Sequence, residues 1–132
     1  MKDGLNALYE RRSVRKYKSE QISDGELEQI LKAGLCAPSA MNRQPAIIIA
    51  VQDKGTIAYM SKLNAQVMGS NGDPFYGAPT VLVVLAEADN INAVKDGSLV
   101  LGNLMNAASA LGIGSCWVNR AQEVFASAEG KA

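Results

Sequence analysis

The stretch AIIIAV at residues 46–51 is an uninterrupted apolar run, and most of its side chains are β-branched. Such side chains favour extended backbone, and a run without polar alternation is typical of a strand covered on both faces. A similar run, TVLVVLA, occupies residues 80–86, and a shorter one, SCWV, occupies residues 115–118. The sequence therefore predicts a small sheet of three buried strands.

Helical patterns surround these strands. Ser23 and Glu26 have the spacing of a capping box, and the apolar stripe behind them predicts a helix over residues 24–36. A longer helix is predicted over residues 92–111, and its expected apolar stripe consists of Val94, Leu101, Leu104, Met105 and Ala108. Shorter helices are expected at residues 3–12, after a cap at Asp53, and at residues 121–128 after a cap at Asn119.

The order of these elements predicts an α/β or α+β fold, a sandwich with a small central sheet flanked by helices. The 132 residues predict one domain, spanning residues 1–132. Residues 92–111 carry apolar side chains on several faces, which is typical of a helix buried on more than one side. We therefore expect this long helix to lie at an interface with a second subunit.

The composition excludes several classes of chemistry. The chain has no histidine, so it cannot use a Ser-His-Asp triad, a Cys-His dyad or a histidine base. Its two cysteines, Cys36 and Cys116, lack the spacing of a zinc or redox motif and fit a reducing cytoplasm. Thirteen basic residues balance thirteen acidic ones, which disfavours nucleic acid as a partner, and no apolar run is long enough for a membrane span.

Two polar stretches are the candidates for a binding site. Residues 11–17 (RRSVRKY) concentrate positive charge beside a hydroxyl, and arginine forks match the oxygens of a phosphate group. Residues 37–45 (APSAMNRQP) form a polar loop between a predicted helix and a predicted strand. The same basic cluster could instead be a solvated helix face, which is the commoner outcome for a run of charges.

Other ligand motifs are incomplete. Residues 112–117 (GIGSCW) begin like a dinucleotide-binding fingerprint, but Trp117 replaces its last glycine and a strand rather than a helix is expected there. No phosphate-binding P-loop occurs. Glu87 and Asp89 form an isolated carboxylate pair, which is a poor basis for a metal site, so we expect no metal.

Taken together, the motifs resemble those of the nitroreductase family of flavoproteins. Residues 11–17 resemble the N-terminal signature of that family, and residues 36–45 (CAPSAMNRQP) resemble its second signature at the expected distance. Residues 76–80 (YGAPT) and 111–118 (LGIGSCWV) are similar to its middle segment and to the end of its central dimer helix. The resemblance covers nearly the whole chain.

The resemblance implies an FMN-dependent oxidoreductase that takes hydride from NADH or NADPH and reduces a small acceptor such as a nitroaromatic or a quinone. It implies a homodimer with FMN at the interface, and chemistry carried by the flavin rather than by a catalytic side chain. The implied contacts to the FMN phosphate, ribityl chain and pyrimidine edge come from Arg11, Arg12, Ser13 and Arg15. Those to the isoalloxazine come from Pro38, Ser39, Ala40, Asn42 and Gln44 of the other subunit, and from Asn119 near the reactive edge.

The resemblance also raises an alternative. Members of the family usually continue with a further strand and a basic stretch, whereas this sequence stops at Ala132 within a helix-like run. We therefore expect a C-terminally short domain. Either it turns over as an oxidoreductase, or it is a flavin-binding or interaction domain without turnover.

Overall fold

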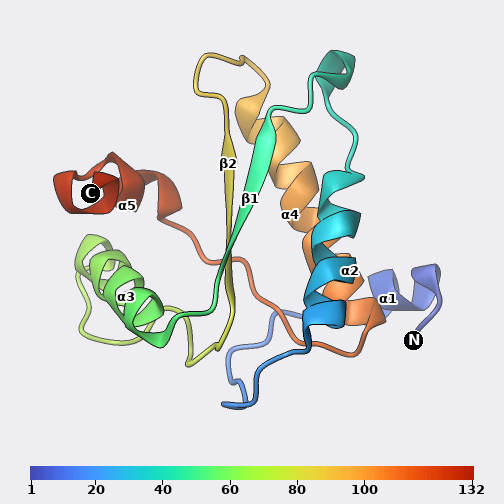
Figure 1. Ribbon diagram of the computed structural model, residues 1–132, viewed down its shortest axis with the longest axis horizontal. Helices are drawn as coiled ribbons and strands as arrows, with labels where there is room; N and C mark the ends of the chain where they lie inside the picture. The colour runs from blue at the N-terminus through green and yellow to red at the C-terminus, as the bar shows by residue number, and fades with distance from the viewer. The chain divides into compact units, whose positions relative to one another are not determined.

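The computed structural model describes residues 1–132 (Figure 1). Its elements, in chain order, are α1 (Gly4–Glu10), α2 (Asp24–Leu35), the 3-10 turn η1 (Ala40–Asn42), β1 (Ala46–Val51), α3 (Lys54–Met68), β2 (Val81–Ala86), α4 (Ala93–Ala110), α5 (Ala121–Ala126) and α6 (Ala128–Lys131). The chain divides into two compact units. Unit 1 contains residues 1–14, 22–49 and 84–116, and unit 2 contains residues 15–21, 50–83 and 117–132.

Helix α4 is the centre of unit 1, and both α1 and α2 pack against it. Its buried residues include a row that repeats every four residues, Asp96, Val100, Leu104 and Ala108, together with Gly97 and Ser109. The prediction for Leu104 and Ala108 is therefore confirmed, whereas Val94 is 79% exposed and lies outside the buried face. The predicted stripe was wrong there because the face that packs is set by the neighbouring helices, not by apolarity alone.

Helix α2 approaches α4 and β1 closely at Gly34. A Cβ atom at this position would lie 2.5 Å from Leu104 Cδ2 and 2.9 Å from Ile48 Cδ1, so only glycine fits without a shift of its neighbours. The N-terminus of α2 has the predicted capping box, in which Ser23 Oγ accepts from Glu26 N at 3.2 Å and Glu26 Oε2 accepts from Ser23 N at 2.8 Å. The start of α2 thus follows from local sequence, whereas its packing at Gly34 depends on residues that are distant in sequence.

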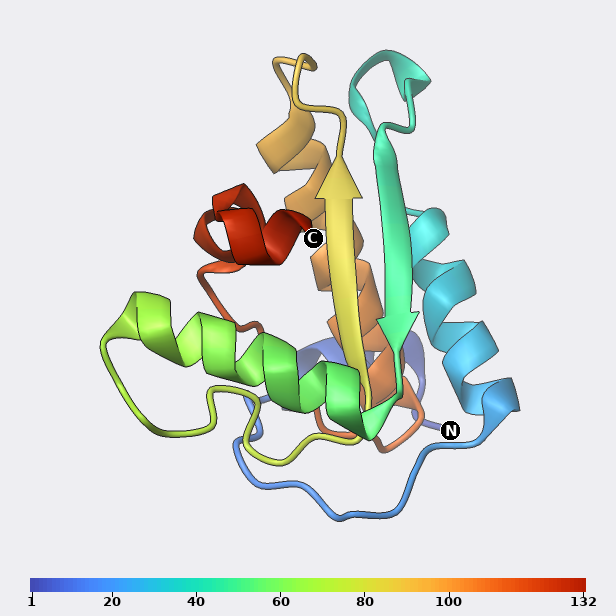
Figure 2. The same cartoon turned by 60° about the vertical axis from the view of Figure 1, so that its left-hand side comes forward.

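The sheet has two strands, β1 and β2, rather than the three predicted. Figure 2 shows them running in opposite directions, and Glu87 N continues the pairing by donating to Pro45 O at 3.3 Å. The third predicted strand, residues 115–118, is reduced to a single parallel bridge between Ser13 and Ser115. A strand requires a partner over several residues, and this segment finds one at a single position.

The strands are also less covered than their sequence predicts. Ile47 is 58% exposed and Ile49 is 45% exposed, whereas Ile48 between them points toward Gly34 of α2. Successive side chains of a strand point to opposite faces, so within this chain the helices cover only one face of β1. The expectation of two covered faces is therefore wrong for the single chain.

Unit 2 is built on α3, against which α5 and α6 pack. Asp53 caps α3 as predicted, with Oδ2 accepting from Thr56 N at 2.7 Å. The predicted helix over residues 121–128 is broken at Ser127, which caps the short α6. Arg120, not Asn119, occupies the position before α5, and it does so with a left-handed φ of 79°.

Asp73 ties part of the loop after α3, residues 70–79, to the helix. Its Oδ1 accepts from Ser61 Oγ at 2.7 Å and from Phe75 N at 2.9 Å, and its Oδ2 accepts from Gly77 N at 2.7 Å. Burial by itself would raise the pKa of Asp73, but the hydrogen bonds from Ser61, Phe75 and Gly77 outweigh it and lower the pKa below its ordinary value.

No helix of the chain is both long and apolar enough to cross a membrane.

We predict that Asp73 makes stability depend on pH. Because its pKa is lowered in the folded state, the carboxylate stabilises the fold above its ordinary pKa of 3.8, and this contribution is lost as the pH falls through the lower folded value. Asp73→Asn should reduce the free energy of unfolding at neutral pH by about 1 kcal/mol, and the deficit should shrink below about pH 4. Urea unfolding between pH 7 and pH 3 measures both effects.

The matched control is Asp89→Asn, since Asp89 is also exposed and makes no hydrogen bond. Its difference from the parent protein should stay small across the same pH range. A deficit of Asp73→Asn that is the same at pH 7 and pH 3 would contradict the prediction.

Candidate functional site

The basic segment begins where α1 ends. Arg11 N donates to Ala7 O at 3.2 Å and closes the helix. The Arg12 guanidinium turns back and donates from Nη1 to Tyr9 O at 2.8 Å and to Arg11 O at 2.7 Å. These carbonyls lie at the C-terminal end of α1, where a cation is favoured. Arg12 is thus already engaged with its own helix.

Arg11 and Arg15 differ from Arg12 because neither guanidinium is hydrogen-bonded to a backbone carbonyl, and none of the three has a protein counter-ion. The one ion pair in the chain joins Lys2 Nζ to Glu10 Oε2 at 2.7 Å. The Arg15 side chain is exposed, and that of Arg11 is half-buried. A guanidinium group without a partner in the protein can bind an anion of matching geometry, such as a phosphate.

Ser13 holds this segment in an extended conformation. It forms the parallel bridge with Ser115, and the next residue, Val14, donates from its backbone N to Ser115 O at 2.9 Å. Val14 packs directly over Gly114, where a Cβ would lie 2.9 Å from its Cγ2. Ser115 Oγ is buried and has no hydrogen-bond partner within the protein. The tertiary contact therefore places an unused hydroxyl beside the basic segment, and sequence analysis did not identify it.

The second predicted stretch, which contains Pro38, Ser39, Ala40, Asn42 and Gln44, forms a tight loop around η1. Three non-glycine residues adopt left-handed backbone: Met41 with φ 54°, Asn42 with φ 53° and Gln44 with φ 51°. Such backbone is unfavourable for L-residues and is commonest at functional sites. Ser39 Oγ closes the loop by accepting from Gln44 N at 2.9 Å. This strained loop leaves the side chains of Asn42 and Gln44 exposed.

Asp96 of α4 also belongs to this loop, although sequence analysis missed it. Its side chain is 4% exposed, and Oδ1 accepts from Ala40 N at 3.1 Å. Its other oxygen, Oδ2, is buried without a hydrogen-bond partner. In the sequence, Asp96 lies four residues before Val100 and eight before Leu104, but the predicted apolar stripe from Val94 to Ala108 did not include it.

Asn119, the last predicted site residue, lies in unit 2. Its backbone carbonyl accepts from Asn64 Nδ2 at 2.9 Å, and Asn64 Oδ1 accepts from Arg120 Nε at 2.8 Å. Asn64 is 3% exposed, so α3 fixes residues 119 and 120 through a buried amide. The exposed side chain of Asn119 and the backbone around it are thereby held in place.

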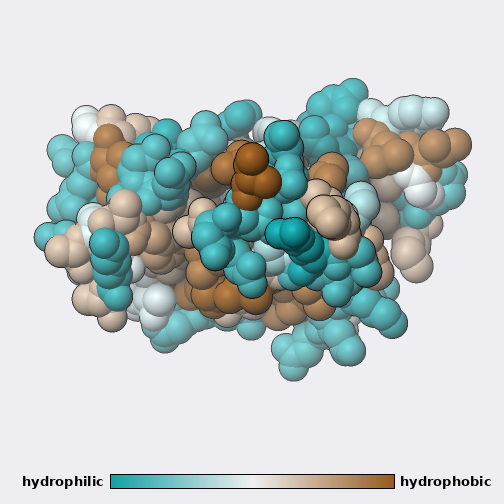
Figure 3. All heavy atoms as spheres, turned by 90° about the horizontal axis from the view of Figure 1, so that it is seen from above, coloured by the Kyte–Doolittle hydropathy of each residue, from teal (hydrophilic) through white to brown (hydrophobic).

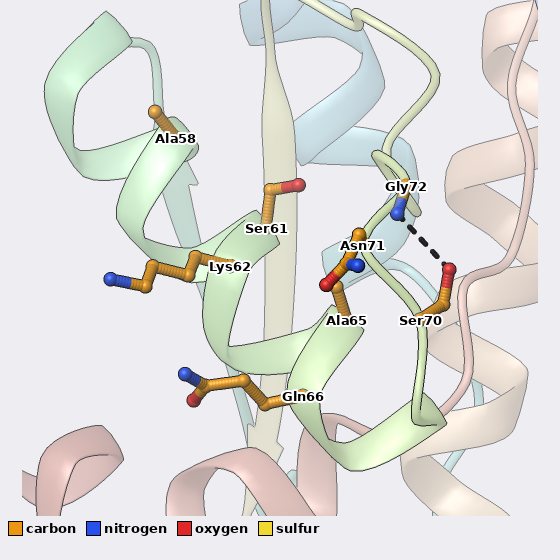
Figure 4. Close-up of a pocket in the computed structure, with 8 residues that line it drawn as sticks. All are labelled: Ala58, Ser61, Lys62, Ala65, Gln66, Ser70, Asn71 and Gly72. Carbon is orange, nitrogen blue, oxygen red and sulfur yellow. Dashed lines mark hydrogen bonds between the residues drawn. The ribbon is translucent and has the colours of Figure 1, made fainter.

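Unit 2 also has a hollow of about 290 Å³ between α3 and the loop after it (Figure 4). Lys62 and Gln66 project from the helix on one side, and Asn71 and Gly72 lie on the other. Gly72 N donates to Ser70 Oγ at 3.0 Å, so the loop side of the hollow is held by its own hydrogen bond. None of the predicted site residues lines it.

The profile of the nitroreductase family matches residues 8–74 and 59–124, which include both predicted signatures. The chain belongs to the nitroreductase family. A protein of Archaeoglobus fulgidus whose name includes NAD(P)H nitroreductase is 37% identical over 123 residues, covering 89% of this chain and 68% of that protein. An FMN reductase [NAD(P)H] of Bacillus subtilis is 28% identical, covering 87% of this chain and 53% of that protein. The chain therefore spans about half to two thirds of these curated relatives.

The solved structures confirm the fold of this family member. The crystal structure of a nitroreductase with bound FMN from Bacteroides fragilis superposes with a TM-score of 0.90 at 28% identity, covering 99% of this chain and 77% of that chain. An FMN-dependent nitroreductase of Clostridium difficile is 36% identical with a TM-score of 0.81, covering 88% of this chain and 60% of that chain. The predicted α+β class and the family resemblance are both confirmed.

We predict that Asn64 is needed to hold residues 119 and 120. Asn64→Ala would leave Arg120 Nε and the Asn119 carbonyl without partners and should reduce the free energy of unfolding by about 1–3 kcal/mol. Chemical denaturation measures this loss. Gln66→Ala on the same helix is the control, since the Gln66 side chain is exposed and makes no hydrogen bond. Equal stability of the two variants would show that the buried amide is not needed.

Proposed function

We propose that this chain is an FMN-dependent oxidoreductase that takes hydride from NADH or NADPH and reduces a small acceptor such as a nitroaromatic or a quinone. Family membership supports the reaction class, and the relatives from Archaeoglobus and Bacillus carry NAD(P)H in their names. The observation that carries the proposal is the pair of guanidinium groups, Arg11 and Arg15, that lack any counter-ion in the protein.

These residues fit the phosphate end of FMN. A phosphate group carries about two negative charges and accepts several hydrogen bonds, which two free guanidinium groups satisfy in bidentate geometry. The Ser13 hydroxyl is exposed beside them, and the backbone of the segment is fixed by the bridge to Ser115. Arg12 would contribute only after releasing the carbonyls of Tyr9 and Arg11.

The loop around η1 is proposed to line the isoalloxazine ring, with Pro38, Ser39, Ala40, Asn42 and Gln44 as its contacts. Its exposed polar side chains and fixed backbone suit a planar, polar-edged ring. The backbone amide of Asn119 is proposed to face the reactive edge. FMN, when bound, supplies the hydride chemistry, so the chain has to bind and orient the ring and needs no histidine base.

A homodimer is part of the proposal. Helix α4 buries one face within unit 1, yet outside that face it exposes 79% of Val94 and 48% of Leu99. Exposed apolar side chains, brown among hydrophilic neighbours in Figure 3, are typical of surfaces that are buried on association. In this arrangement FMN lies at the interface, and the loop around η1 comes from the second subunit. We keep the cytoplasm as the proposed location, which the two free thiols support.

We predict a dimer in solution because of these exposed apolar groups. Light scattering should give twice the mass of one 14.0 kDa chain. Val94→Lys should shift the mass toward that of one chain, since a charge buried at an interface is costly, whereas Lys95→Ala beside it should not. A folded parent protein with the mass of a single chain would contradict the dimer.

The alternative function is a flavin-binding or interaction domain without turnover. Its signature would be FMN that binds to the protein but is not reduced when NADH or NADPH is added.

The decisive experiment is a titration with FMN followed by NADH and NADPH, monitored by visible absorption. We expect bound flavin whose absorption bleaches with a nicotinamide donor. Arg11→Ala and Arg15→Ala should each weaken FMN binding about tenfold to hundredfold, because each removes a charge-assisted contact. Lys54→Ala, which removes an exposed charge elsewhere, should leave the affinity unchanged. Failure to bind FMN would overturn the proposal, and unchanged affinity of both arginine variants would overturn the phosphate assignment.

A further inference from the structure

One face of α4 contacts the backbone that leads into the loop around η1 at two points. Asn103 Nδ2 donates to Ala33 O near the end of α2 at 2.9 Å, and Asp96 Oδ1 accepts from Ala40 N at 3.1 Å. The two residues are seven apart, which is about two turns, so they lie on the same side of the helix. On this side of the helix, Val100 lies between them and is buried, and Leu104, next to Asn103, is buried as well. The helix therefore holds the segment from Ala33 to Ala40 both by packing and by hydrogen bonds.

The loop itself requires such support. Met41, Asn42 and Gln44 each adopt left-handed backbone without being glycine, and conformations of this kind persist only where the surroundings enforce them. The internal bonds of the loop are Asn42 N to Ser39 O at 3.0 Å, Arg43 N to Ala40 O at 3.2 Å and Gln44 N to Ser39 Oγ at 2.9 Å. The bond to Asp96 is the side-chain hydrogen bond that connects this turn to a different element of the fold.

The burial of Asp96 at this position is energetically unfavourable. A carboxylate that is 4% exposed, with one oxygen hydrogen-bonded once and the other unpaired, costs free energy relative to an apolar side chain of similar size. A leucine at this position could be buried without an unpaired polar atom, as Leu104 is on the same face. The specific gain from Asp96 is an acceptor aimed at the backbone of the loop.

We propose that Asp96 is a positioning residue that fixes the conformation of residues 39–44 by accepting the Ala40 N–H. The loop is thereby held, before any ligand arrives, in the shape that the isoalloxazine ring requires. The inference has two parts. The part that concerns FMN binding, its flavin arm, rests on the proposed function. The part that concerns the conformation of the loop, its structural arm, is independent of flavin. Ordering the loop in advance improves affinity because the cost of fixing it is not paid on binding.

The structural arm uses trypsin cleavage after Arg43, an exposed residue inside the loop. Asp96→Ala should raise the native-state rate of cleavage at this bond about tenfold, because removing a hydrogen bond to a charged group favours local opening. Asp96→Asn, which retains a carbonyl oxygen as acceptor, should stay within about threefold of the parent protein. The matched control is Ser109→Ala, which removes another buried hydrogen bond of α4, from Ser109 Oγ to Ala7 O at 3.0 Å.

The flavin arm compares the same variants in an FMN titration. Asp96→Ala should weaken FMN binding about tenfold or more, Asp96→Asn should restore it, and Ser109→Ala should leave it unchanged even if it lowers overall stability. If Asp96→Ala does not fold, Asp96→Ser, whose side chain is too short to reach Ala40 in the same way, takes its place.

The outcomes separate the two proposals. Unchanged cleavage after Arg43 in Asp96→Ala, or an equal increase in Ser109→Ala, would overturn the positioning role whether or not FMN binds. A parent protein that binds no FMN would overturn the proposed function, and the cleavage data would still decide whether Asp96 holds the loop. Increased cleavage without any change in FMN affinity would show that the loop is not part of the flavin site and would also overturn the inference.

Discussion

The close contact between α2 and α4 is the constraint on which unit 1 depends. At Gly34 the helices approach until a side chain no longer fits, and Leu104 and Ile48 occupy the space that a Cβ would need. This approach brings the end of α2 within hydrogen-bonding distance of Asn103. It also determines where the chain leaves α2 and enters the loop around η1. A packing requirement at one glycine thus sets the starting point of the candidate flavin-lining loop.

The two parts of the candidate site in unit 1, the basic segment and the loop around η1, differ in what is available to a ligand. In the basic segment, the backbone is fixed by the bridge between Ser13 and Ser115, while the guanidinium of Arg11 keeps no counter-ion. In the loop around η1, the side chains are exposed and the backbone is strained. The unpaired charge of Arg11 and the strained backbone of the loop both lower the stability of the protein when no ligand is bound. A ligand that pairs the charge and uses the fixed backbone regains part of that stability.

Local sequence was sufficient wherever a structure depends on neighbouring residues. The capping box at Ser23 and Glu26, the cap at Asp53 and the strand cores were predicted correctly because each depends on residues a few positions apart. The family was also predicted correctly from two spaced signatures. The third strand failed because pairing depends on a distant partner, and Ser115 finds one only at Ser13. Asp96, Asn64 and Ser115 were missed as site components for the same reason, since each acts on backbone far away in sequence.

The sequence by itself determined the residue types that the site can offer: arginines without nearby acids, a polar loop between helix and strand, and no histidine. These follow from composition and spacing, which do not change on folding. Only the tertiary structure decided which face of α4 is buried and which distant carboxylate holds Ala40. Those outcomes depend on the approach of α2 to α4 and on hydrogen bonds across dozens of residues, and no local pattern encodes such distances.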